Sequence, residues 1–152
     1  ADVILGSHSH MVGKMEQKTY KAADGSEREV FLAYSLGNFF AADDGVYTRE
    51  SVVLNLTFTK DSETGETHIT EANYVPIYLW DAGSDAATRY QVLNVHQAIS
   101  LYDSAYIGRV DEDTYAALTD TLDILKKNTE SDLDCGAEAA QSGTDGAAQP
   151  DS

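Results

Sequence analysis

Hydrophobic and polar residues in the first part of the chain follow the patterns of β-strands. Asp2 to Gly6 contains three consecutive aliphatic residues before a glycine, which predicts a short, fully buried strand. Glu29 to Ser35 predicts a second buried strand, and Lys14 to Ala22 a weaker extended segment. Ser51 to Thr59 alternates apolar and polar residues, and His68 to Trp80 returns after a polar connection. The last two segments predict a β-hairpin.

The pattern changes from strands to helices near residue 95. Tyr90 to Val95 predicts one more strand, and the next segments, His96 to Ala105 and Asp111 to Lys127, place apolar residues three and four positions apart. We expect Asp111 or Asp113 to cap the second helix. In the preceding hairpin, Pro76 suggests an edge strand or a bulge.

These elements predict an α/β (α+β) domain over residues 1–127, with strands at about residues 2–95 and helices at 96–127. From Asn128 onward the chain consists mostly of Gly, Ala, Ser, Gln and acidic residues, with one leucine. Such a composition offers too little apolar surface to stabilise a fold. Residues 128–152 are therefore predicted to form a disordered acidic tail.

The net charge limits the classes of partner. The chain carries a formal charge of −16, and residues 1–127 still carry −10 once the six acidic residues of the predicted tail are left out. A field of this sign repels nucleic acid and anionic lipid, so we expect no nucleic-acid partner. The single cysteine, Cys135, excludes an intramolecular disulfide and a cysteine-based zinc site.

The segment that suggests chemistry is Gly6 to His10, with the sequence Gly-Ser-His-Ser-His. In an extended chain, His8 and His10 would project to the same side, and two imidazoles so placed can bind one metal ion or one ion each of a pair. The alternative is two exposed loop histidines, because two ligands do not complete a metal site. His68 is expected to be a solvent-exposed strand residue and His96 a structural side chain.

Two motifs resemble capsule (poly-γ-glutamate) synthesis proteins of the CapA/PgsA type. Asp2 to His10 is similar to the segment in which a buried strand leads into a Gly-Ser-His-Pro-His loop, and Tyr34 to Phe39 (Tyr-Ser-Leu-Gly-Asn-Phe) is similar to a second signature of that family. Weaker similarity continues through Glu50 to Leu54, Val75 to Tyr78 and Tyr90 to Leu93, so the resemblance covers about residues 1–95.

The resemblance implies a fold and a site. The family has a calcineurin-like metallophosphoesterase sandwich, of which this chain would be the C-terminal half. His8 and His10 would then each bind one of two divalent metal ions, and the missing ligands would come from the N-terminal half. Asn38 either lines the pocket or only forms the turn after its strand, and Phe39 stands where a metal ligand would be needed to complete a phosphoesterase Gly-Asn-His motif. Three carboxylates nearby, Asp43, Asp44 and Glu50, are expected to lie in solvated loops.

The resemblance also implies a bacterial protein at the cell surface, anchored in the membrane through a segment outside this chain. It would act with other proteins of capsule polymer synthesis and export. One hypothesis is an enzyme in which a metal-activated water hydrolyses a phosphoester or amide-like bond; the alternative is a non-catalytic scaffold or assembly subunit. A polymer-binding module fits poorly, because poly-glutamate is an anion and the candidate basic cluster consists only of Lys14, Lys18, Lys21 and Arg28.

The chain opens within a strand-like run and without a methionine, as expected of a piece of a longer protein. Because the sequence offers no third ligand at a convincing spacing, we expect this chain alone to bind metal weakly and to be inactive. We also expect it to expose an apolar face or an open sheet edge. Such surfaces recruit other chains, so the expected partners are the N-terminal half of the same protein and, in its absence, further copies of this chain.

Overall fold

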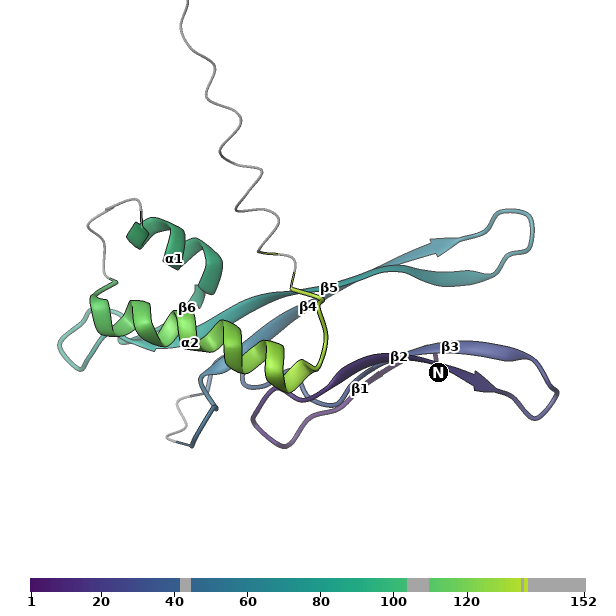
Figure 1. Cartoon of the computed structure of the whole chain (residues 1–152), viewed down its shortest axis with the longest axis horizontal. Helices are drawn as coiled ribbons and strands as arrows, with labels where there is room; N and C mark the ends of the chain where they lie inside the picture. The colour runs from purple at the N-terminus through teal and green to yellow at the C-terminus, as the bar shows by residue number, and fades with distance from the viewer. Residues whose placement is uncertain (42–44, 104–109, 135, 137–152) are drawn as a thin grey trace, which may run out of the picture.

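A computed structural model describes residues 1–41, 45–103, 110–134 and 136, and shows a mixed α+β fold with two three-stranded sheets and two helices. The first sheet has the order β1-β3-β2 and the second β4-β5-β6 (Figure 1). The six strands of the two sheets are β1 (Val3–Leu5), β2 (Met15–Lys21), β3 (Glu27–Ala33), β4 (Glu50–Lys60), β5 (Thr67–Asp81) and β6 (Tyr90–Asn94). The helices are α1 (Val95–Asp103) and α2 (Glu112–Thr129).

The predicted hairpin is confirmed as the antiparallel pair β4–β5, whose ladder runs from Glu50 opposite Tyr78 to Lys60 opposite Thr67. A register shift lies between Thr57 and Phe58. The second hairpin, β2–β3, projects in the same direction as the first in Figure 1. The weakly alternating segment from Lys14 to Ala22 does form a strand, β2, because β3 supplies its hydrogen-bonding partner.

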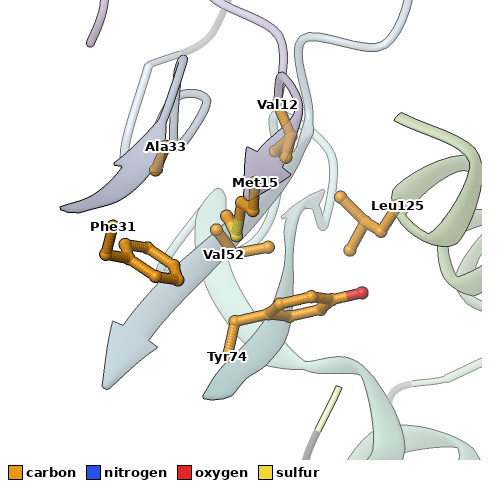
Figure 2. Close-up of a cluster of buried hydrophobic side chains, with 7 residues drawn as sticks. All are labelled: Val12, Met15, Phe31, Ala33, Val52, Tyr74 and Leu125. Atoms are coloured by element: carbon orange, nitrogen blue, oxygen red, sulfur yellow. The ribbon is translucent and has the colours of Figure 1, made fainter. Parts of the chain in front are cut away.

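The main core lies between the two sheets. Met15 and Phe31 from the first sheet meet Val52 and Tyr74 from the second, and Leu125 of α2 closes the cluster (Figure 2). A second cluster of Val95, Ala98 and Leu118 packs α1 against α2. Inward-facing residues of both sheets thus share one core, which fixes how the sheets lie on each other.

Strand β1 differs from its prediction as fully buried. It pairs in parallel with β3, but Ile4 and Leu5 are 48% and 54% exposed. Among the described residues β1 pairs only with β3, so the other edge of β1 and part of the surface of β1 face solvent. A run of aliphatic residues predicts a strand but does not determine whether both of its faces are covered.

The predicted boundary at Asn128 is wrong, because α2 continues to Thr129 and the chain then returns to the second sheet. The amide of Tyr74 in β5 donates to the carbonyl of Leu133 at 2.8 Å, and Tyr74 also forms an isolated bridge with Asp134. Leu133 packs against the main core. The segment thereby supplies an acceptor to the side of β5 at a point that β6 does not cover. Residues 135 and 137–152 of the expected tail lie outside the described residues.

Pro76 lies inside β5, the central strand of its sheet, and not on an edge strand or at the bulge. The ladder with β6 begins one residue later, at Ile77, and the bridge to Asp134 lies two residues earlier, at Tyr74. Pro76 thus falls between the two segments that pair with this side of β5. The missing amide of proline costs no ladder hydrogen bond at such a point.

Asp111 caps α2, as the sequence predicts, and its side chain accepts a hydrogen bond from the Thr114 amide at 2.8 Å. The hydroxyl and the amide of Thr114 hold the pKa of Asp111 below its ordinary value. Asp111→Ala should therefore lower the free energy of unfolding by about 1 kcal/mol. Asp113→Ala, which removes another exposed acid of the same turn, should cost less than half of that.

The cap also predicts a pH dependence. A carboxyl group whose pKa is lowered by folding stabilises the protein above its unfolded-state pKa, about 3.9, and loses that contribution as the pH falls through its folded-state pKa. The difference between wild type and Asp111→Ala, measured by urea unfolding, should thus be constant near neutrality and shrink at acid pH. An equal difference at pH 7 and at pH 2 would contradict the assignment of the cap.

Candidate functional site

Parallel pairing of β1 with β3 brings the two motif segments together. Both strands end at the same edge of the sheet, so the loops that follow them, with His8 and His10 after β1 and Asn38 after β3, leave from neighbouring positions. The amide of Gly6 donates to the carbonyl of Ala33 at 2.7 Å, which continues the pairing to the start of both loops. Loops at the carboxyl ends of parallel strands are a frequent location of binding sites.

Glycine is required at position 6 by the closeness of the second loop. A Cβ atom there would overlap the carbonyl oxygen of Tyr34. The other end of this loop also lies close to the chain after β3, because the Gly13 amide donates to the Ser35 carbonyl at 3.0 Å. The loop that carries the histidines is thus held against the chain after β3 at both of its ends.

The backbone at the two histidines is not extended. His8 and His10 have φ angles of 87° and 61°, in the left-handed region that residues other than glycine seldom adopt. The expectation that both side chains project to one side of an extended chain is therefore wrong. Strained backbone of this kind costs of the order of 1–3 kcal/mol per residue and is concentrated at functional sites. Both imidazoles belong to exposed residues.

The structure brings His10 and Asn38 into direct contact, with 2.9 Å between the imidazole Nδ1 and the amide Oδ1. The amide nitrogen of Asn38 donates to the carbonyl of Thr48 at 3.3 Å. Thr48 is buried, and its hydroxyl donates to the carbonyl of Gly45 at 2.9 Å. His10 and Asn38 are recognisable as candidates in the sequence, whereas Thr48 is not, because it contributes through its backbone and no side-chain pattern marks it.

The loop before Asn38 is fixed to β4. Gly37 has a φ of 78°, and a Cβ atom there would lie 3.0 Å from the carbonyl oxygen of Glu50. The hydroxyl of Ser51 and the amide of Val52 both donate to the Leu36 carbonyl, at 2.7 and 3.2 Å. Asn38 therefore follows a tightly held turn, and its side chain is placed by the second sheet as well as by the first.

The other histidines lie apart from this pair. His68 is exposed on β5, with its Nε2 3.6 Å from a carboxylate oxygen of Glu66. His96 is the second residue of α1, and its Nε2 lies 2.9 and 3.0 Å from the two carboxylate oxygens of Asp134. A Cβ atom on Gly136 would overlap the His96 ring, so the C-terminal segment passes directly over it. His96 thus joins α1 to that segment, which is a structural role.

Of the three nearby carboxylates, Asp43 and Asp44 lie outside the described residues, and Glu50 lies within them. Glu50 is not in a solvated loop, because it begins β4 and its Oε2 is buried with no hydrogen-bond partner among the described residues. No group of three or more His, Cys, Asp or Glu side chains in residues 1–41, 45–103, 110–134 and 136 is placed to hold a metal ion.

Acidic residues neutralise much of the candidate basic cluster. Lys18 lies 2.5 Å from one carboxylate oxygen of Glu16, and Lys14 lies 3.4 Å from the other. Lys14 also pairs with Glu130, at 3.0 Å. Glu130 raises the pKa of Lys14, with a smaller contribution from Glu16, and Lys18 lowers that of Glu16. Lys14 thus joins the start of β2 to the C-cap residue of α2, whereas Lys18 pairs within β2, so neither lysine is an unpaired cation.

A groove of about 800 Å³ lies between the two hairpins, and its lining includes Asp2, Glu27, Glu29 and Glu66. Neither candidate histidine nor Asn38 lines it. The site identified from the sequence is therefore an exposed pair of loops and not this groove. No helix of the described residues is long and apolar enough to cross a membrane.

Apolar side chains are exposed on both motif segments. Phe39 and Phe40 follow Asn38 directly and are 63% and 61% exposed, and Ile4 and Leu5 precede the histidine loop. Val46 is 71% exposed in the segment that leads to Thr48. Comparison with known proteins gives no further assignment: no family model, no curated protein and no solved structure matches this chain.

Proposed function

We propose that this chain is part of a capsule (poly-γ-glutamate) synthesis protein with a calcineurin-like metallophosphoesterase sandwich, in which His8 and His10 bind divalent metal ions. The observation that supports this most strongly is the contact between the loops after β1 and β3, where His10 meets Asn38 at 2.9 Å. These are the two segments on which the resemblance to the family rests. His10 and Asn38, 28 positions apart in the chain, are thus in contact.

The chemistry of the donors fits a divalent transition metal. Imidazole nitrogen is the commonest protein ligand for such ions. Both histidines are exposed, and both have the left-handed backbone that is concentrated at functional sites. When bound, a divalent ion would activate a water molecule and polarise a phosphoryl or carbonyl oxygen.

Two imidazoles need further ligands, and in the proposal these come from the N-terminal half of the same protein. The exposed apolar residues beside the site support a contact surface there: Ile4, Leu5, Phe39, Phe40 and Val46. Large exposed apolar patches mark interaction sites more often than free surface. Within the described residues one edge of β1 has no partner strand, and in the absence of that half this edge would favour association between copies of this chain.

The charge distribution bears on the role in polymer synthesis. The chain is strongly acidic, and Lys14 and Lys18 are paired with carboxylates, so direct binding of poly-glutamate is disfavoured. The proposed role is hydrolysis of a phosphoester or amide-like bond in a cell-surface protein, anchored through a segment outside this chain. It would act beside the other proteins of polymer synthesis and export.

The test uses the protein that contains both halves. His8→Ala and His10→Ala should each reduce bound divalent metal at least tenfold, measured by elemental analysis after gel filtration, and should abolish hydrolysis. His68→Ala, which removes an exposed histidine elsewhere, should change neither. Circular dichroism should show that all three variants remain folded.

The outcomes separate the alternatives. Unchanged metal content in both His8→Ala and His10→Ala would contradict the proposed site. Metal that depends on these histidines but supports no hydrolysis of phosphoester or amide substrates would favour a non-catalytic assembly subunit.

A further inference from the structure

The hydrogen bonds of Asn38 determine which way its amide points. A backbone carbonyl can only accept a hydrogen bond, so the atom of Asn38 that faces the Thr48 carbonyl at 3.3 Å must be the amide nitrogen. The other end of the amide, Oδ1, is then the atom 2.9 Å from the Nδ1 of His10. The orientation of the amide follows from the network itself, which is how such assignments must be made.

The amide orientation in turn determines the tautomer of His10. An amide oxygen has no proton to donate, so the Nδ1 of His10 must carry the proton in this hydrogen bond. A neutral imidazole has one protonated nitrogen, and its Nε2 therefore keeps a free lone pair. His10 is exposed, so solvent or a ligand can reach it.

We propose that Asn38 is a positioning residue that holds His10 as the Nδ1-protonated tautomer and thereby reserves Nε2 for a divalent metal ion. The metal part rests on the function proposed above, whereas the tautomer rests only on hydrogen bonds within this chain. Histidines that bind metals generally donate their other ring N–H to an oxygen, which fixes the ring and raises its basicity. In this chain the oxygen is the amide Oδ1 of Asn38.

Asn38 is suited to this role because its own position is fixed. It follows the turn that Ser51 and Val52 hold through the Leu36 carbonyl, and its amide nitrogen is bound to the backbone of a buried residue, Thr48. A side chain held in this way keeps its oxygen in place when the His10 ring moves. The turn and the pocket-lining roles of Asn38 are thus not alternatives, since the rigid turn is what places the amide.

The tautomer can be measured in this chain without any metal. Long-range ¹H–¹⁵N correlation spectra of the imidazole rings, recorded about 1.5 pH units above the ordinary histidine pKa of about 6.5, distinguish a protonated from an unprotonated ring nitrogen. The His10 spectrum should show the proton on Nδ1. In Asn38→Ala that preference should be lost, while Asn38→Asp, which keeps an acceptor oxygen, should retain it.

Two controls show that the change is local. Asn55→Ala removes an asparagine that pairs with Asn73 on the β4–β5 hairpin, and it should leave the His10 spectrum unchanged. The spectrum of His68 should be the same in every variant. A His10 ring protonated on Nε2 in the wild type, or one that is unaffected by Asn38→Ala, would overturn the positioning role.

Zinc then tests the metal part separately. Addition of Zn²⁺ alone should shift the Nε2 resonance of His10 in the wild type, and Asn38→Ala should need tenfold to a hundredfold more Zn²⁺ for the same shift. The predicted tautomer together with no Zn²⁺-dependent shift would overturn the metal role and the proposed function while the tautomer assignment stood. A shift of equal midpoint in both proteins would overturn the positioning role but support the metal site.

Discussion

Phe31→Ala should lower the free energy of unfolding by about 4 kcal/mol. Phe31 is 1% exposed and contributes its ring from β3 to the core between the two sheets, beside Met15 and Val52 (Figure 2). Truncation removes the apolar contacts of the ring and leaves a cavity that the surrounding strands cannot fully close. In a small domain a loss of this size removes a large part of the total stability.

Phe58→Ala is the matched control for this prediction. It deletes the same ring from a strand, β4, but Phe58 is 53% exposed, so the expected loss is below about 1 kcal/mol. Urea unfolding followed by tyrosine and tryptophan fluorescence gives both values. Equal losses in the two variants would mean that the sheets do not pack around Phe31 as described.

A chain that ends at Thr129 should be about 3 kcal/mol less stable than one that ends at Gly136. The shorter chain loses Leu133 from the core and leaves the amide of Tyr74, a residue 1% exposed, without its acceptor. An unsatisfied buried amide costs about 1–3 kcal/mol, and the partly buried leucine contributes about 1–1.5 kcal/mol. The His96–Asp134 pair is lost as well.

The longer chain is the control, because it removes residues 137–152 and retains the described contacts. Its thermal transition should match that of the complete chain, whereas the shorter chain should melt about 10 °C lower. Equal melting temperatures for the two truncated chains would show that the segment after α2 does not stabilise the domain.

Local patterns in the sequence were sufficient to predict most of the elements. The alternation from Ser51 to Thr59 gave a hairpin arm because one face of β4 is buried and the other is not. The spacing of Leu118, Leu122 and Leu125 gave α2 because those side chains share one face, and Asp111 capped it as expected. Each of these features depends on neighbours within a few positions.

Features that depend on distant partners were not predictable in the same way. The return of Leu133 to β5 is a contact with Tyr74, about 60 positions earlier, and one leucine in a polar segment gives no periodic signal. The exposure of Ile4 and Leu5 depends on what covers β1, which the strand itself does not encode. The left-handed backbone of His8 and His10 was not predicted either, because two histidines two positions apart give no sign of it.

The candidate residues could be chosen from the sequence, but their arrangement could not be predicted. His8, His10 and Asn38 were identified by residue type and motif, and the structure places His10 against Asn38. The support from Thr48 is a backbone carbonyl, for which sequence offers no marker. The pairing of His96 with Asp134 was equally hidden, because both residues are common surface types far apart in the chain.

The most direct test of the proposed metal site is paramagnetic broadening by Mn²⁺ in the ¹H–¹⁵N spectrum of this chain. The method detects weak binding, as expected for an incomplete ligand set, and it locates the ion residue by residue. We predict that substoichiometric Mn²⁺ broadens His8, His10 and Asn38 first. Broadening confined to the acidic groove residues Glu27, Glu29 and Glu66, or spread evenly over the acidic surface, would contradict metal binding by His8 and His10.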